Sequence, residues 1–154
     1  MPTTSAAGLL LYRLTADGPE VLLVHPGGPF WARKDLGAWS LPKGEVGPGE
    51  DLLRAAHREF EEELGAAVSG PETPLGVVHQ RNRKHVHAWA VHADFDPAQL
   101  RSNTFELEWP PGSGEKRSFP EVDRAEWFPI AEARRRLLAA QEPFLDRLLE
   151  VLRR

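Results

Sequence analysis

Acidic side chains gather near the end of a helix that the sequence predicts over residues 51–64. At about 100° per residue, Glu59, Glu62 and Glu63 fall on one face of that helix. Like charges at this spacing destabilise a helix by roughly a few tenths of a kcal/mol per pair, and acids are also disfavoured at the negative end of the helix dipole. A hard divalent cation, bound through oxygen ligands, reverses the sign of these repulsions. The cluster therefore predicts a metal site for Mg²⁺ or Mn²⁺.

The alternative interpretation is a solvated acidic face, partly offset by Arg54 and Arg58. Glu59 and Glu63, however, fall beside the apolar stripe of the predicted helix rather than opposite it. The boundary of the core is where a cleft would hold ligating side chains. This position favours the metal site over the solvated face.

The segment before the helix, SLPKGEVGPGE, is rich in glycine, so its backbone can approach a ligand closely. Together, this segment and the helix resemble the Nudix box, the signature of the Nudix hydrolases. The nine motif positions fall at the fixed spacing of the family: Gly44, Glu50, Arg58, Glu59, Phe60, Glu62, Glu63, Gly65 and Ala66. Ala66 is the one departure, because the family usually has a bulkier apolar residue there.

The resemblance implies an α/β fold, a Nudix-type α/β/α sandwich with a mixed β-sheet flanked by helices. It also implies a metal-dependent enzyme that hydrolyses a nucleoside diphosphate linked to another moiety, with Mg²⁺ or Mn²⁺ as cofactor. The attack of water on phosphorus would be assisted by the cation. A catalytically silent Nudix-like module that only binds a nucleotide is the alternative, and it would be marked by lost box glutamates. The sequence keeps them all.

The resemblance also assigns roles to individual residues. Glu59 and Glu63 would be the main metal ligands, with Glu62 an additional or water-mediated one and the carbonyl of Lys43 a backbone ligand. Arg58 would orient a glutamate, Glu50 would tie the loop to the helix, and Gly44 and Gly65 belong to the motif. The general base stays open between Glu59 and a later glutamate, for which the sequence offers Glu106, Glu108, Glu115 and Glu121.

The residues before the box bear on the substrate. The run from Trp39 to Gly44 resembles the lead-in of diadenosine polyphosphate and diphosphoinositol polyphosphate hydrolases. A tyrosine of the asymmetric dinucleoside tetraphosphate enzymes would fall at Arg83, and a proline of the ADP-ribose hydrolases would fall at Arg81, so both of these markers are absent. The substrate class therefore stays open within nucleotides and polyphosphates.

Aromatic and basic residues outside the box are candidate substrate contacts. Trp31 is suited to stack on a base, or alternatively to cap the sheet. Residues 79–92 contain basic but no acidic side chains, which suits polyphosphate oxygens as well as a solvated hairpin turn. The candidate substrate-binding residues are Trp31, Arg33, Trp39, Lys43, Arg81 and Lys84.

Length and periodicity predict a single domain over residues 1–154, in which strands alternate with helices. An exposed loop is expected over residues 110–120, and Trp89, Trp109 and Trp127 are expected in the core. His85 and His87 are interpreted as structural. The predicted strands cover residues 6–12, 21–25, 75–81, 85–95, 103–109 and 125–128, and the predicted helices cover 51–64, 130–140 and 143–152.

Composition limits the function further. The net charge of −4 argues against a general electrostatic grip on nucleic acid or an anionic membrane, so the expected partner is a small nucleotide or polyphosphate. The absence of cysteine excludes disulfides and thiolate metal sites. Without a visible targeting signal the default expectation is a cytoplasmic protein, and the oligomeric state is open.

Overall fold

The computed structural model describes residues 4–81 and 84–154, and Arg83, named above, lies outside these residues. The strands are β1 (Thr4–Thr15), β2 (Gly18–Pro26), β3 (Lys43–Glu45), β4 (Glu72–Gln80), β5 (Lys84–His92), β6 (Thr104–Glu108), β7 (Lys116–Pro120) and β8 (Val122–Pro129). The helices are α1 (Leu52–Leu64), α2 (Ile130–Arg136) and α3 (Glu142–Leu152), with short 3₁₀ turns at Pro97–Gln99 and Ala139–Gln141.

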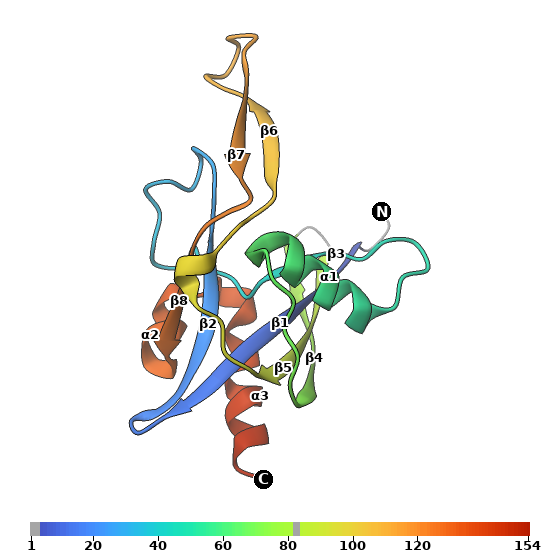
Figure 1. Cartoon of the computed structure of the whole chain (residues 1–154), viewed down its shortest axis with the longest axis vertical. Coiled ribbons are helices and arrows are strands. Elements are labelled where there is room, and N and C mark those ends of the chain that lie inside the picture. The colour runs from blue at the N-terminus through green and yellow to red at the C-terminus, as the bar shows by residue number, and fades with distance from the viewer. Residues whose placement is uncertain (1–3, 82–83) are drawn as a thin grey trace.

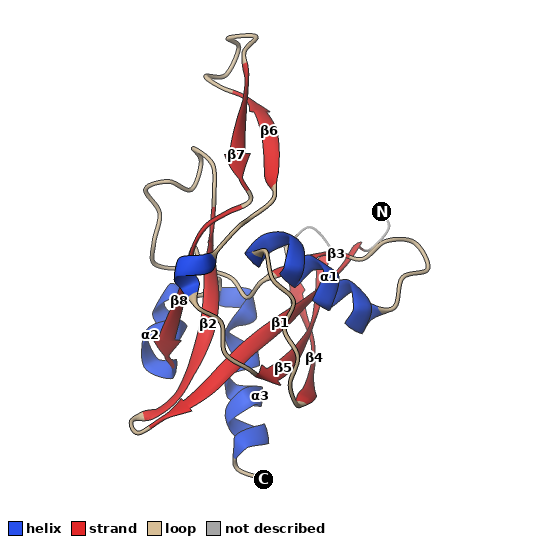
Figure 2. Cartoon of the chain, in the orientation of Figure 1, coloured by secondary structure: helices blue, strands red, loops and turns tan. Residues whose placement is uncertain are grey.

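The central sheet has the strand order β4-β5-β1-β2-β8, and β3 pairs with β1. The β1–β5 pair is parallel, whereas β1 pairs with β2 and β3 in antiparallel fashion, so the sheet is mixed as predicted. Helix α1 covers one face of the sheet, and α2 and α3 lie on the other (Figures 1 and 2). This arrangement confirms the α/β class and the sandwich architecture.

The core is divided by the sheet into two layers because strand side chains alternate between its faces. On the α1 side, Phe60 and Leu64 of the helix pack with Leu9 and Leu11 of β1. On the other side, Leu10 packs in a cluster with residues of α3. Burial on both faces explains why β1 reads as a nearly continuous apolar run.

Both ends of helix α1 are capped by the residues that flank it. The side chain of Asp51 caps its N-terminus by accepting a hydrogen bond from the Arg54 backbone N–H. Gly65 ends the helix in the left-handed conformation, with φ of 87°, and its N–H donates to the carbonyl of Glu61. The predicted helix over residues 51–64 is therefore confirmed, with Asp51 as its cap.

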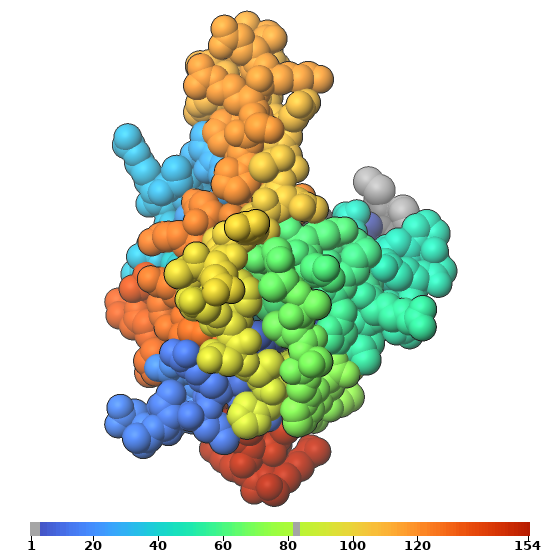
Figure 3. Space-filling model, viewed as in Figure 1, coloured from blue at the N-terminus to red at the C-terminus, as the bar shows by residue number. Residues whose placement is uncertain are grey.

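The predicted exposed loop over residues 110–120 is wrong in its second half. Lys116–Pro120 form β7, which pairs with β6 in a hairpin that stands clear of the body of the molecule (Figure 3). Phe119 lies opposite Phe105 in the register, and this cross-strand pair stabilises the hairpin. Trp109, expected in the core, instead lies at the hairpin and packs edge-on against Phe30.

Helix α2 is shorter than the predicted helix over 130–140, since it ends at Arg136. Leu137 is extended and bridges to Trp39, and the Leu138 N–H donates to the Trp39 carbonyl at 2.8 Å. Tertiary pairing thus takes the backbone groups that would have continued the helix. The C-terminal helix covers the sheet as predicted, with Phe144, Leu145 and Leu148 buried. Within the described residues, none of the helices is both long and apolar enough to span a bilayer.

Candidate active site

Helix α1 lies directly against β3, and a glycine makes the close contact. A Cβ atom added to Gly44 would lie 1.9 Å from Glu59 Oε2 and 2.0 Å from Glu59 Cδ. The strand cannot move away to relieve this contact, because Gly44 is in register with Ala7 of β1. A side chain at position 44 would therefore displace the Glu59 carboxylate, which explains the glycine.

Arg58 ties the loop before α1 to the helix. Its Nε donates to Glu50 Oε2 at 2.8 Å and its Nη2 donates to Glu50 Oε1 at 2.9 Å. Glu50 Oε1 also accepts from the Gly47 N–H at 2.9 Å. These donors, Arg58 above all, lower the pKa of Glu50 to about 2, so the ion pair persists across the physiological range.

The same guanidinium also holds two glutamates of the helix face. Arg58 Nη1 donates to Glu59 Oε1 at 2.9 Å and to both carboxylate oxygens of Glu62 at 3.2 Å. The Glu59 side chain is only 12% exposed, whereas that of Glu62 is 39% exposed. Burial raises the pKa of Glu59 against the effect of Arg58, so this carboxylate is costly to keep charged without a further cation.

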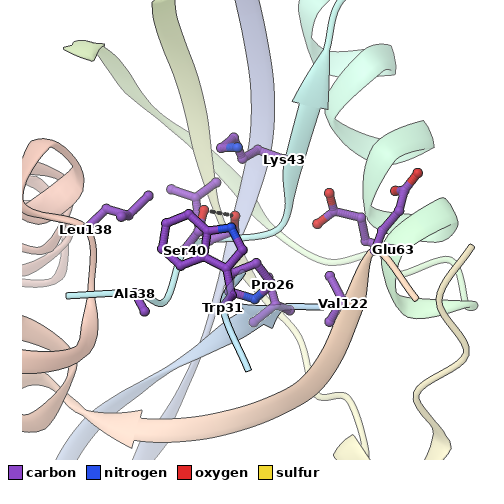
Figure 4. Close-up of a pocket in the computed structure, with 11 residues that line it drawn as sticks. Pro26, Trp31, Ala38, Ser40, Lys43, Glu63, Val122 and Leu138 are labelled. Carbon is purple, nitrogen blue, oxygen red and sulfur yellow. Dashed lines mark hydrogen bonds between the residues drawn. The ribbon is translucent and has the colours of Figure 1, made fainter. Parts of the chain in front are cut away.

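Glu63 faces a cavity of about 220 Å³ between α1, β3 and the loop after β2. Figure 4 shows Glu63, Lys43 and Trp31 entering this cavity from those three elements. Burial is the main cause that raises the pKa of Glu63 to about 8, opposed by Lys43 and reinforced by the charges of Glu59 and Glu121. Several carboxylates therefore lie close together, with too few neighbouring cations to balance their charge.

Glu121 lines this cavity from the junction of β7 and β8. Its N–H donates to the Asn103 carbonyl at 2.8 Å, and the Asn103 N–H donates to the Glu62 carbonyl at 2.9 Å, so the junction is anchored to α1. Burial, followed by repulsion from Glu62, raises the pKa of Glu121. The structure therefore brings this later glutamate to the box glutamates.

The other three later glutamates belong to the projecting hairpin. Glu108 accepts a hydrogen bond from the Gly114 N–H at 2.7 Å, and Glu115 pairs with Arg117 at 3.7 Å. Glu106 is exposed on β6. Of the four candidates that the sequence offered, the described chain places Glu121 at the cavity.

The donor set suits a divalent metal in its chemistry. Carboxylates and a backbone carbonyl form an oxygen-rich set, which suits a hard cation. Burial, reinforced by repulsion among the glutamates, raises the pKa values of Glu59, Glu63 and Glu121, and a bound cation would offset both effects. Among residues 4–81 and 84–154, no three acidic, histidine or cysteine side chains already form a metal-binding group, and Arg58 instead lies between Glu59 and Glu62. The residues fit a cation in type and charge.

Basic residues also border the site. Burial and the adjacent charge of Lys84 lower the pKa of Lys43, so two ammonium groups face each other here. Lys84 and Arg81 line a second cavity of about 590 Å³, and Trp31 lines both cavities. Trp31, Arg81 and Lys84, three of the candidate substrate contacts, therefore line the second cavity, and Lys43 lines the first cavity next to Lys84.

Two other candidate contacts are not brought there. Trp39 is fully buried, and its Nε1 donates to Asp35 Oδ1 at 2.7 Å. Its ring packs against Phe128 in the core, so the structure does not bring Trp39, a predicted substrate contact, to the cavities. Arg33 is exposed on the loop after β2, outside the residues that line the two cavities.

Gln141 positions the lead-in to the box and was missed by the sequence interpretation. It is fully buried, its Nε2 donates to Ser40 Oγ and to Gln80 Oε1, and its Oε1 accepts from the Leu41 N–H at 3.1 Å. Every polar group of this side chain is thus used to join two cavity walls. A lone glutamine within an apolar helical pattern was the available signal.

The fold and the carboxylate-lined cavity define an α/β/α sandwich with a site suited to a cation and phosphates. The NUDIX domain model matches residues 2–149, and the chain belongs to this family. It is 32% identical to Nudix hydrolase 6 of Arabidopsis thaliana over 127 residues, 81% of this chain and 39% of the relative. It is also 45% identical over 58 residues to the asymmetrical bis(5′-nucleosyl)-tetraphosphatase of Caenorhabditis elegans, 38% of each.

A third relative, an RNA pyrophosphohydrolase of Rhodospirillum rubrum, is 40% identical over 67 residues, 42% of this chain and 38% of the relative. The chain thus spans about a fifth to two fifths of the length of the curated relatives it matches. Among solved structures, a C. elegans Ap4A hydrolase binary complex has a TM-score of 0.68 at 23% identity, covering 98% of both chains. The NUDIX domain of Shewanella oneidensis NrtR complexed with ADP ribose has a TM-score of 0.64 at 17% identity, covering 99% of this chain and 90% of that one. These structures support the fold alone.

Proposed function

We propose that this Nudix chain is a metal-dependent pyrophosphohydrolase that cleaves a nucleoside diphosphate linked to another moiety. The observation that carries the proposal is the convergence of Glu59, Glu62, Glu63 and Glu121 beside Lys43, around a glycine that admits the Glu59 carboxylate. A purely structural acidic cluster would not need repelling carboxylates held within a cavity.

Glu59, Glu62, Glu63 and the Lys43 carbonyl are the proposed holders of Mg²⁺ or Mn²⁺. When bound, the cation would neutralise phosphate charge and lower the pKa of a water molecule that attacks phosphorus. Arg58 keeps Glu59 and Glu62 in place through its fixed guanidinium geometry.

Glu121 is our candidate for the general base. Burial raises its pKa, which brings a carboxylate closer to the proton affinity that accepting a proton from water requires. Glu59, the alternative, already accepts a hydrogen bond from Arg58. A loss of turnover in Glu121→Gln with unchanged metal binding would support this role, whereas near wild-type turnover would exclude it.

Dinucleoside polyphosphates are the proposed substrate class. Lys43, Lys84 and Arg81 supply positive charge along the path between the two cavities, which suits a chain of phosphates. Trp31 offers an aromatic surface for a base. The similarity to a tetraphosphatase and the lead-in from Trp39 to Gly44 are consistent with this class.

The test is product analysis after incubation with Mg²⁺ or Mn²⁺ and a panel of candidate substrates. The panel comprises dinucleoside polyphosphates, nucleoside triphosphates, ADP-ribose, nucleotide sugars, diphosphoinositol polyphosphates and a 5′-triphosphorylated RNA. Glu63→Gln is the inactive variant, and Glu61→Gln is its control because Glu61 is exposed on the same helix. We expect a dinucleoside polyphosphate to be cleaved best, with loss of activity only in Glu63→Gln. Tight binding without cleavage would instead favour a nucleotide-binding module.

A further inference from the structure

A buried histidine joins three segments around the site. His25 lies near the end of β2 and is 1% exposed. Its Nδ1 lies 2.8 Å from Asp123 Oδ1 on β8, and its Nε2 lies 2.6 Å from the backbone carbonyl oxygen of Lys34. The ring also packs edge-on against Trp39 in the core. The side chain is therefore held by contacts with Asp123, Lys34 and Trp39.

Each ring nitrogen of His25 has one polar partner. A carbonyl oxygen only accepts hydrogen bonds, so Nε2 is the donor to Lys34. Nδ1 is hydrogen-bonded to the Asp123 carboxyl group.

Each of the two hydrogen-bond partners of His25 is connected to a residue that lines the cavity. On the loop side, the Lys34 N–H donates to the Trp31 carbonyl at 3.0 Å, and Trp31 lines both cavities. On the strand side, Asp123 follows Glu121 by two residues. The Gly27 N–H donates to the Glu121 carbonyl at 2.9 Å, which anchors Glu121 to the chain just after His25.

We propose that His25 is a positioning residue with two separable effects. Its bond to Lys34 holds the loop that presents Trp31 to the substrate, and its bond to Asp123 holds the start of β8 that presents Glu121. The inference rests on the proposed function for its kinetic consequences. Its structural consequences can be measured without any substrate.

Two substitutions separate the bonds. The amide nitrogen of asparagine can take the place of Nδ1, so His25→Asn retains a donor to Asp123 and loses the bond to Lys34. The amide nitrogen of glutamine can take the place of Nε2, so His25→Gln retains the donor to Lys34 and loses the bond to Asp123. Asp123→Ala removes the second bond from the other side, and His92→Asn changes an exposed histidine as a control.

The first readout is amide hydrogen exchange measured by NMR on the intact chain. His25→Asn should speed exchange of the Lys34 amide by roughly 3–10-fold and leave the Gly27 amide unchanged, because one hydrogen bond of ordinary strength is lost. His25→Gln and Asp123→Ala should show the reverse pattern. Equal acceleration of both amides in His25→Asn and His25→Gln would overturn the proposal in favour of a merely structural role.

The second readout is steady-state hydrolysis of the best-cleaved substrate. His25→Asn should raise KM by roughly 3–10-fold with kcat retained, whereas His25→Gln should lower kcat by a similar factor with KM retained. The double variant His25→Gln/Asp123→Ala should have a kcat no lower than that of either single variant, because both substitutions remove the same hydrogen bond. Parallel changes of kcat and KM in both variants would overturn the inference. If the wild type cleaves nothing, the proposed function fails, and the exchange pattern alone decides the two effects of His25.

Discussion

Replacing Glu63 with glutamine should stabilise the metal-free protein, and increasingly so as the pH rises. The pKa of Glu63 is raised from 4.5 to about 8, mainly by burial. Between these values the folded protein keeps a proton that the unfolded chain releases, so a rise in pH favours unfolding. Glutamine has nearly the same shape and never carries the charge, so the variant lacks this penalty.

The size of the effect follows from the shift. Each pH unit within the window is worth up to about 1.4 kcal/mol, so the change from pH 5.5 to pH 7.5 is at most about 2.7 kcal/mol. Relaxation around the buried charge screens part of this, and we expect the gain of Glu63→Gln over the wild type to grow by about 1 kcal/mol or more. Below about pH 4.5 the pH-dependent difference should vanish.

The assay is urea unfolding in EDTA at pH 5.5, 6.5 and 7.5 for the wild type and two variants. Glu61→Gln is the matched control, because it removes a glutamate charge from an exposed position of the same helix. Its effect should stay within about 0.5 kcal/mol at every pH. A stability difference for Glu63→Gln that does not change with pH would refute the reasoning about the buried carboxylate.

Four further predictions concern activity and can be checked by steady-state kinetics. Gly44→Ala should lower hydrolysis at least roughly 10-fold while circular dichroism shows a retained fold, because its Cβ would displace the Glu59 carboxylate. Arg58→Lys keeps the charge but loses the paired bonds to Glu50, so kcat should fall by roughly 10-fold or more. Lys84→Ala should raise KM, more for longer polyphosphates, and chelation by EDTA should stop the reaction until Mg²⁺ or Mn²⁺ is restored.

Features with local causes could be predicted from the sequence. Helix α1 follows from its apolar period, its Asp51 cap and the glycine after its last turn. The shared face of Glu59, Glu62 and Glu63 follows from helical spacing alone. The glycine at position 44 can also be recognised from its spacing along the sequence to these residues. Its contact with Glu59, however, depends on the pairing of β3 with β1.

Features with distant causes could not be predicted in this way. Strand β7 forms because Phe119 meets Phe105 across a turn rich in glycine and proline, which in isolation is typical of a loop. The burial of Trp39 depends on its pairing with Leu137, nearly a hundred residues away along the chain. Glu121 could not be separated from the other later glutamates, since its place beside α1 depends on the hydrogen bonds of Asn103.

We propose that the glutamate-lined cavity hydrolyses a phosphoanhydride by attack of water. The most direct measurement is hydrolysis of the best-cleaved substrate in ¹⁸O-labelled water with Mg²⁺, followed by mass spectrometry of both products. We predict one ¹⁸O atom in the phosphate of one product, at a rate that falls by orders of magnitude in Glu63→Gln and stays near wild type in Glu61→Gln. Labelled product formed equally fast by Glu63→Gln would contradict the assignment of the site. The absence of any labelled product across the panel would contradict the proposal that the protein is a hydrolase.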